Sequence, residues 1–198
     1  MPNGKFFELC DDKNGAYLYH KSKLGEFFLG SDAITHSYKY HKRKKGITEQ
    51  VPNEVNELFD VGSTIGAYII FPNNRINGKH TINQSRGVNL FIDDRFDLTL
   101  ECIRRFYSAE KSPLYVTLLR YTNFYDLFDD FTGYINFFLL NDLVDDNYNI
   151  KFYLPFDGFS TRPTFKDVDQ YLLYKKRVID FVQARNTRID SYLASKGK

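Results

Sequence analysis

The sequence predicts an α+β fold in a single domain, with a small antiparallel sheet in the N-terminal part and a mainly α-helical C-terminal two-thirds. The chain has 198 residues, which suits one domain with a sizeable core. Aromatic runs bounded by turn residues dominate the first 71 positions, and the apolar period changes to that of a helix after position 91. Since no repeat or linker intervenes, we expect one domain over 1–198, β-rich in 1–90 and mainly helical in 91–198.

Four segments are predicted to supply the sheet. Residues 16–20 and 26–29 are aromatic-rich runs separated by a short polar loop, which indicates a hairpin. Residues 67–71 form a compact apolar run, and residues 148–154 form a second one. Each of these two runs is closed by a proline, which cannot donate the next ladder hydrogen bond. Both are therefore predicted as strands.

Helical spacing begins just beyond Asp94. The apolar residues that share one helix face there are Phe96, Leu100, Ile103 and Tyr107. Pro52 opens an earlier, short helical piece, and Ser112 followed by Pro113 is a helix-start signature. Apolar residues continue the helical pattern through 124–139. Thr164 with Asp167 resembles a capping box for a last long helix.

Composition indicates a cytoplasmic protein without metal or cofactor. The two cysteines, Cys10 and Cys102, and the absence of a signal-peptide pattern in residues 1–5 favour a reducing compartment. The longest apolar run of the second half, residues 134–140, is far shorter than the roughly 20 residues of a membrane span, so no membrane association is expected. The four histidines and two cysteines have no zinc spacing, and no glycine-rich phosphate loop is present.

Residues 72–87 form a polar segment that contains no acid and offers cations, amides and an imidazole. Such donors suit a phosphate or carboxylate, and a turn at Asn77–Gly78 would fold the segment back on itself. We therefore predict that these groups converge on one solvent-reachable pocket. The predicted ligand-binding residues are Arg75, Asn77, Lys79, His80, Asn83, Gln84 and Arg86.

The function predicted from this segment is the binding of an anionic ligand, with nucleic acid or a nucleotide favoured. A basic stretch at 39–45, interleaved with Tyr38 and Tyr40, has the composition of a second nucleic-acid contact or of a solvated loop. The sequence leaves open whether the protein is an enzyme. If it is, His80 is the catalytic residue that carries the proton, and the arginines of the loop stabilise developing negative charge.

The competing interpretation is a protein-interaction module, for example one used in conflict between phage and host. Its exposed aromatic side chains would dock a protein partner. The amides of residues 72–87 would then be purely structural, because long irregular connections use such side chains to satisfy buried backbone groups.

Arg75 and His80 are separated by four residues. This spacing resembles that of the active pair of the HEPN ribonucleases, but in that family the pair sits on a helix, and Asn77–Gly78 would break a helix here. In the last helix Arg185-Asn186 is followed by Asp190 where the family has histidine. Without an imidazole at that place, kinship would imply binding rather than cleavage.

A wider resemblance covers nearly the whole chain. Its motifs are the segments 17–22 (YLYHKS), 69–72 (IIFP), 81–87 (TINQSRG) and 94–107 (DRFDLTLECIRRFY). They are similar to the core of a bacterial domain-of-unknown-function family. The resemblance implies the importance of residues 72–87 but no activity, and it leaves open a native chain that begins further upstream.

Overall fold

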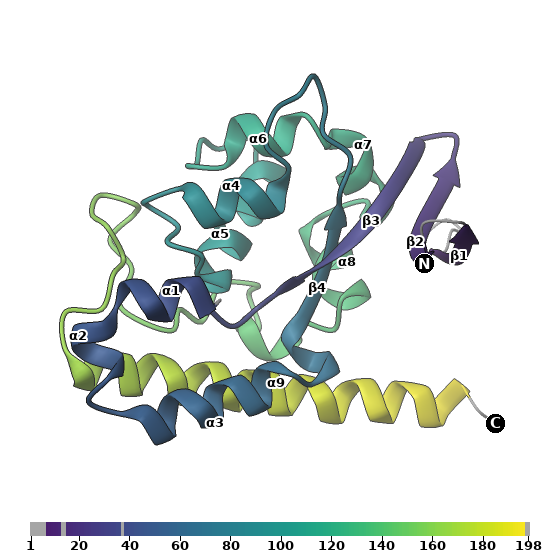
Figure 1. Ribbon diagram of the computed structural model, residues 1–198. Coiled ribbons are helices and arrows are strands. Elements are labelled where there is room, and N and C mark those ends of the chain that lie inside the picture. The colour runs from purple at the N-terminus through teal and green to yellow at the C-terminus, as the bar shows by residue number, and fades with distance from the viewer. Residues whose placement is uncertain (1–6, 13–14, 37, 197–198) are drawn as a thin grey trace.

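One four-stranded antiparallel sheet is built from the N-terminal part of the chain in a computed structural model that describes residues 7–12, 15–36 and 38–196 (Figure 1). Residues 1–5, in which the sequence shows no signal-peptide pattern, lie outside the described part of the chain. The strands follow one another in chain order: β1 (Glu8–Asp12), β2 (Gly15–Ser22), β3 (Gly25–Ala33) and β4 (Tyr68–Pro72). The predicted hairpin and the predicted strand before Pro72 are confirmed, whereas β1 is an additional edge strand.

Alternation of side chains fixes which face of β3 is buried. Phe27 and Leu29 point into the core, whereas Phe28 between them is 43% exposed. In the partner strand β4, Ile69 and Phe71 are buried in the same way, and Ile69 lies opposite Asp32 in the register. The central strands therefore bury one apolar face and leave the acid Asp32 at the end of β3 that leads away from the hairpin.

Helices fill the connection between β3 and β4. They are α1 (Tyr38–Arg43), α2 (Lys45–Thr48), α3 (Pro52–Gly62) and the 3-10 turn η2 (Ile65–Ala67). The helix predicted to open at Pro52 is confirmed. The basic stretch at 39–45 forms two short helices rather than a loop, so the first 90 residues hold the whole described sheet together with several helices.

The C-terminal part is helical, as predicted. Its elements are α4 (Ile82–Val88), α5 (Phe96–Tyr107), α6 (Tyr115–Leu119), α7 (Thr122–Tyr125), η3 (Asp126–Phe128), α8 (Phe131–Phe137), η4 (Asn141–Leu143) and α9 (Val168–Lys196). The continuous helical pattern expected over 124–139 is interrupted. Asp129 adopts a φ of 65°, and the carboxylate of Asp130 then accepts a hydrogen bond from the Gly133 N–H at 2.7 Å to cap α8.

The strand predicted at 148–154 is wrong. The segment makes one isolated bridge, between Val144 and Ile150, and joins no strand of the described sheet. Side chains satisfy its backbone instead: the Tyr153 N–H donates to Asp97 Oδ2 at 2.9 Å, and Arg177 Nη1 donates to the carbonyl oxygens of residues 152 and 153. An extended apolar segment can therefore complete its hydrogen bonds between two helices without a neighbouring strand.

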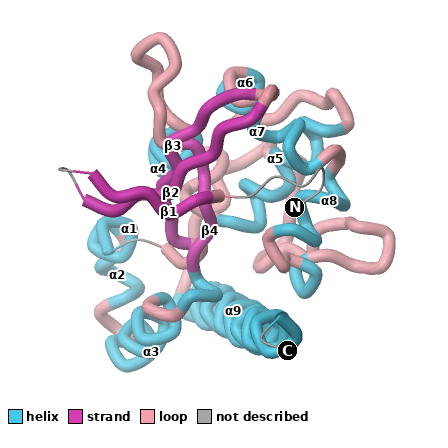
Figure 2. The backbone as a smooth tube through the Cα atoms, turned by 90° about the vertical axis from the view of Figure 1, so that its right-hand side faces the viewer, coloured by secondary structure: helices cyan, strands magenta, loops and turns pink. Residues whose placement is uncertain are grey.

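The last helix, α9, runs along one side of the molecule, next to α3 and η2 (Figures 1 and 2). It begins one turn later than the Thr164 capping box would place it. Asp167 is the cap instead, because its carboxylate accepts from the Gln170 N–H at 2.8 Å while the Gln170 side chain accepts from the Lys166 N–H at 3.2 Å. No helix within the described residues combines the length and the apolar character needed to cross a membrane.

Candidate anion-binding loop

The connection from β4 to α4 is anchored to its surroundings at its first residues. The Asn73 N–H donates to the carbonyl oxygen of Phe28 at 2.7 Å, and the side chain of Asn74 accepts from the Phe28 N–H at 2.8 Å. The hydroxyl of Tyr121 donates to the Asn74 carbonyl oxygen at 2.8 Å. These contacts tie the base of the loop to β3 and to the segment after α6.

The tip of the loop turns where the sequence predicts. Asn77 and Gly78 both have positive φ, 51° and 68°, and the Lys79 N–H donates to the Ile76 carbonyl oxygen at 3.1 Å. This places Arg75, Asn77, Lys79 and His80 on an exposed projection, which rises beyond α4 and α6 in both views (Figures 1 and 2). Among the described residues, the side chains at 75, 79 and 80 have no hydrogen-bond or ion-pair partner.

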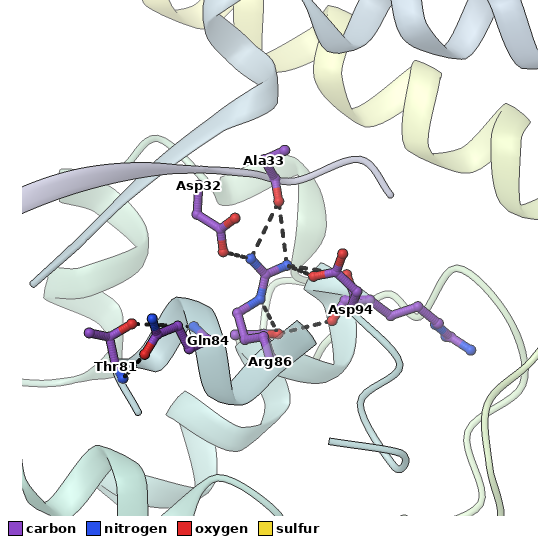
Figure 3. Close-up of polar contacts among 8 residues, drawn as sticks. Asp32, Ala33, Thr81, Gln84, Arg86 and Asp94 are labelled. Carbon is purple, nitrogen blue, oxygen red and sulfur yellow. Dashed lines mark hydrogen bonds and ion pairs between the residues drawn. The ribbon is translucent and has the colours of Figure 1, made fainter. Parts of the chain in front are cut away.

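Arg86, in α4, is fully buried, and its side chain points from that helix toward Asp32 and Ala33 of β3 (Figure 3). Its guanidinium pairs with Asp32 through Nη1, donates to the Asp94 carbonyl oxygen at 3.2 Å and lies 3.8 Å from the Asp94 carboxylate. Nε donates to Thr99 Oγ1 at 2.9 Å, and both Nη atoms reach the Ala33 carbonyl oxygen at 3.4 Å. Burial lowers the pKa of Arg86, and the charge of Asp94 opposes that shift.

Asn83 and Gln84 are also engaged within the protein. In the amide orientation that satisfies both groups, the Asn83 side chain donates to both carboxylate oxygens of Asp32 at 2.8 Å. Gln84 completes a capping box with Thr81: the Gln84 N–H donates to the threonine hydroxyl, and the glutamine side chain accepts from the Thr81 N–H at 3.2 Å (Figure 3).

The predicted site is therefore divided into two parts. The seven predicted residues do not share one pocket. Asn83 and Arg86 bind Asp32 of β3, and Gln84 caps α4. No local signal in the sequence links Asp32 to Arg86, which lies 54 positions later. The outer residues at 75, 77, 79 and 80 remain directed to solvent.

Arg120 is a further cation at this place, and sequence reasoning did not single it out. Its Nη2 donates to the carbonyl oxygen of His80 at 2.8 Å, and its Nη1 donates to the Val116 carbonyl oxygen at 3.1 Å. Arg120, at the end of α6, therefore fixes the backbone of the loop at His80 and adds a guanidinium group next to that residue. We call Arg75, Lys79, His80 and Arg120 the cationic ridge.

The basic stretch at 39–45 is partly structural. Tyr40, which a nucleic-acid contact would use for stacking, is fully buried and donates its hydroxyl hydrogen to Asp93 at 3.1 Å. His41 is buried against the Tyr171 hydroxyl at 3.3 Å, and the Lys44 ammonium bonds the Thr164 hydroxyl. Lys42, Arg43 and Lys45 remain exposed. The side chains at 38 and 39 lie outside the described part of the chain.

Arg185 and Asn186 of α9, the residues that resemble a ribonuclease motif, form hydrogen bonds to backbone groups of other segments. Arg185 is 6% exposed and donates to the carbonyl oxygens of Gly66, Tyr68 and Phe138 at 2.9, 2.6 and 3.0 Å. Asn186 accepts from the Gly66 N–H at 2.7 Å. These two side chains join α9 to the start of β4. Within the described residues, no cluster of three or more histidine, cysteine or acidic side chains could hold a metal ion.

Comparison with known proteins was informative at the level of the family. The sequence model of the family described as "Family of unknown function (DUF6994)" matches residues 1–189. Neither the search of curated proteins nor the search of solved structures found a match.

Proposed function

We propose that this chain, which belongs to the Family of unknown function (DUF6994), is a cytoplasmic protein that binds nucleic acid through the cationic ridge. The supporting observation is the division of the loop: the side chains of Arg75, Lys79 and His80 are exposed without a carboxylate partner among the described residues, whereas Arg86 is paired with Asp32. The ion pair between Arg86 and Asp32 fixes the C-terminal end of the loop, so the exposed tip projects from a fixed position.

The shape of the loop favours a polyanion over a small anion. A projecting turn cannot surround a single phosphate, but it can lie along a backbone that carries one charge at every nucleotide. Arginine and lysine at such a surface neutralise phosphates and release condensed counterions, so binding is expected to weaken steeply as salt rises. Cytoplasmic location is supported by Cys10 and Cys102, which are both free thiols.

The direct test is the fluorescence anisotropy of a labelled short single-stranded RNA and of a labelled DNA duplex, measured between about 50 and about 200 mM salt. The test protein carries Arg75→Gln and Lys79→Gln together. We expect weaker binding, with the slope of log K against log salt reduced by about 0.7 per lost contact for the single strand and about 0.9 for the duplex. The matched control is Lys151→Gln, an exposed lysine outside the ridge.

Three outcomes would contradict the proposal. The wild-type protein could bind neither probe at the lower salt, the ridge variant could bind as the wild type does, or Lys151→Gln could weaken binding equally. Melting temperatures of both variants should match the wild type, because surface substitutions usually change the free energy of unfolding by less than about 0.5 kcal/mol.

The competing function, docking of a protein partner, is supported by apolar side chains near the ridge. Exposed apolar residues of α4, of α6 and of the segment after α4 include Val88 (62%), Leu90 (49%), Val116 (71%) and Leu119 (47%). A co-purifying protein that survives high salt and is lost in Val116→Asp, with no binding of either nucleic acid, would favour this function.

A further inference from the structure

A cavity of about 240 Å³ lies between the residues that lead into α5 and the segment 154–166, which is yellow-green in Figure 1 and leads into α9. Its lining includes Phe91, Arg95 and Leu98 on one side and Phe156, Arg162 and Lys166 on the other. None of these belongs to the cationic ridge. With Phe159, which also lines it, the cavity brings three basic side chains and three aromatic rings together at a separate place in the fold.

Arg95, one of the residues that line the cavity, is buried and held in one orientation by hydrogen bonds. The side chain is 1% exposed, and its Nε and Nη2 donate to the two oxygens of Asp97 at 3.1 and 2.5 Å. Asp97 is itself fully buried and also accepts from the Tyr153 N–H. Arg95 lines the cavity, and the third nitrogen of its guanidinium, Nη1, has no hydrogen-bond partner among the described residues. Asp97 therefore fixes the guanidinium of a lining residue and leaves one of its nitrogens without a protein acceptor among the described residues.

The mouth of the cavity has a positive balance. Arg162 and Lys166 are exposed, and neither forms an ion pair within the described part of the chain. The acid of the lining, Asp157, is occupied by its own turn: it accepts from the Ser160 N–H at 3.1 Å and from the Thr161 hydroxyl at 2.5 Å. An anion that enters meets the two mouth cations first and Arg95 behind them.

The aromatic wall is held in place from behind. The Phe156 ring stacks on Phe152, with centroids 4.3 Å apart and ring planes 20° apart, and it meets Phe159 edge-on at 4.8 Å. Phe91 is 42% exposed and lines the same cavity. A flat ring that enters would gain stacking or edge contact with an aromatic surface.

We propose that this cavity binds a nucleoside monophosphate, with the phosphate at Arg95 Nη1, Arg162 and Lys166 and the base against Phe91. Charge-assisted hydrogen bonds from arginine fit a phosphate, and an aromatic face fits any base. The volume lies just below the usual range of ligand pockets, about 300–1,000 Å³, which suits one nucleotide better than a dinucleotide. The proposal does not depend on the ridge.

The test is calorimetric titration of the whole chain with the four nucleoside monophosphates, with adenosine and with inorganic phosphate. We expect at least one monophosphate to bind, phosphate to bind more weakly and adenosine to bind much more weakly than its monophosphate. The double variant Arg162→Gln and Lys166→Gln should weaken nucleotide binding about tenfold or more. Phe91→Ser should weaken nucleotide binding but leave phosphate binding unchanged.

Two controls separate this proposal from the ridge. Lys23→Gln, at an exposed lysine of the turn between β2 and β3, and Arg75→Gln with Lys79→Gln should both bind nucleotide as the wild type does. Failure of all four monophosphates to bind the wild type, equal binding by the cavity variant, or equal binding of adenosine and its monophosphate would overturn the proposal. Arg95 is left unchanged, because its removal would strand the buried Asp97 charge.

Discussion

The carboxylate of Asp32 in β3 binds the guanidinium of Arg86 in α4, so a segment whose own sequence lacks acids obtains its counter-ion from the sheet. Asn83 donates to the same carboxylate. Asp32 therefore contacts two residues of α4, one of which follows it by 54 positions, and this contact fixes the position of α4 against β3.

Replacement of Arg86 by Met should destabilise the protein strongly. The change leaves the carboxylate of Asp32 without its buried partner, so we expect the free energy of unfolding to fall by about 3–5 kcal/mol in urea denaturation followed by circular dichroism. Adding Asp32→Leu to this variant should recover part of the loss, because the unpaired charge is removed. Arg75→Met, on the exposed tip, is the matched control. A loss no larger than in that control would show that the pair contributes little.

Two glycines should respond in opposite directions to alanine. A Cβ at Gly66 would lie 2.6 Å from Asn186 Oδ1 and 2.7 Å from the Val182 carbonyl oxygen, so Gly66→Ala should cost about 1–3 kcal/mol. Gly46 lies in α2 with nothing within 4 Å of the added carbon. Gly46→Ala should stabilise by up to about 1 kcal/mol. Thermal melts of both variants measure the contrast, and equal shifts would refute the packing argument.

His36 should make the protein less stable in mild acid. The imidazole is buried between the rings of Tyr40 and Tyr174, with centroids 3.8 and 4.5 Å away, and neither ring nitrogen forms a hydrogen bond of normal geometry with the described residues. Burial, followed by electrostatic repulsion from the nearby His41 and Arg95, lowers its pKa well below the ordinary value.

The sign follows from proton binding. Below pH about 6.5 the unfolded chain takes up a proton at His36 that the folded chain refuses, so this contribution to stability is complete above that pH and is lost as the pH falls further. We expect a slope of up to about 1.4 kcal/mol per pH unit from this residue. In His36→Phe the urea-derived stability should depend less on pH between about 6.5 and 5. Identical pH profiles for variant and wild type would exclude His36 as the source.

The two thiols should differ in reactivity. Cys102 is fully buried in α5, and burial raises its pKa to about 12, so the native protein should keep it as an inert thiol. Cys10, in the edge strand β1, is partly exposed. A chromogenic disulfide reagent should therefore titrate one thiol in the native state and both in guanidinium. Rapid loss of both native thiols would show that α5 opens readily, and Cys10→Ser should leave a protein with no fast-reacting thiol.

The elements that the sequence revealed are those whose signal is local. The β2–β3 hairpin, β4, α5 and the stripe of α9 each repeat an apolar period within one segment. Helix α4 was missed because its seven residues are mostly polar and are punctuated by glycine, so it has no apolar stripe of its own.

The errors come from partners that are distant in sequence. Residues 148–154 have the composition of a strand, but Asp97 and Arg177 supply the hydrogen bonds that a strand would have supplied. The acid-free loop has the composition of an anion site, and for its inner part the anion is Asp32. Composition reveals what a segment needs, whereas the fold decides which group meets that need.

Arg185 donates hydrogen bonds to the carbonyl oxygens of Gly66 and Tyr68, which lie 119 and 117 positions earlier in the chain. During synthesis these hydrogen bonds can therefore form only after residue 185 of α9 has left the ribosome. A nascent chain that stalls before residue 185 would present the sheet to chaperones and proteases without these two hydrogen bonds.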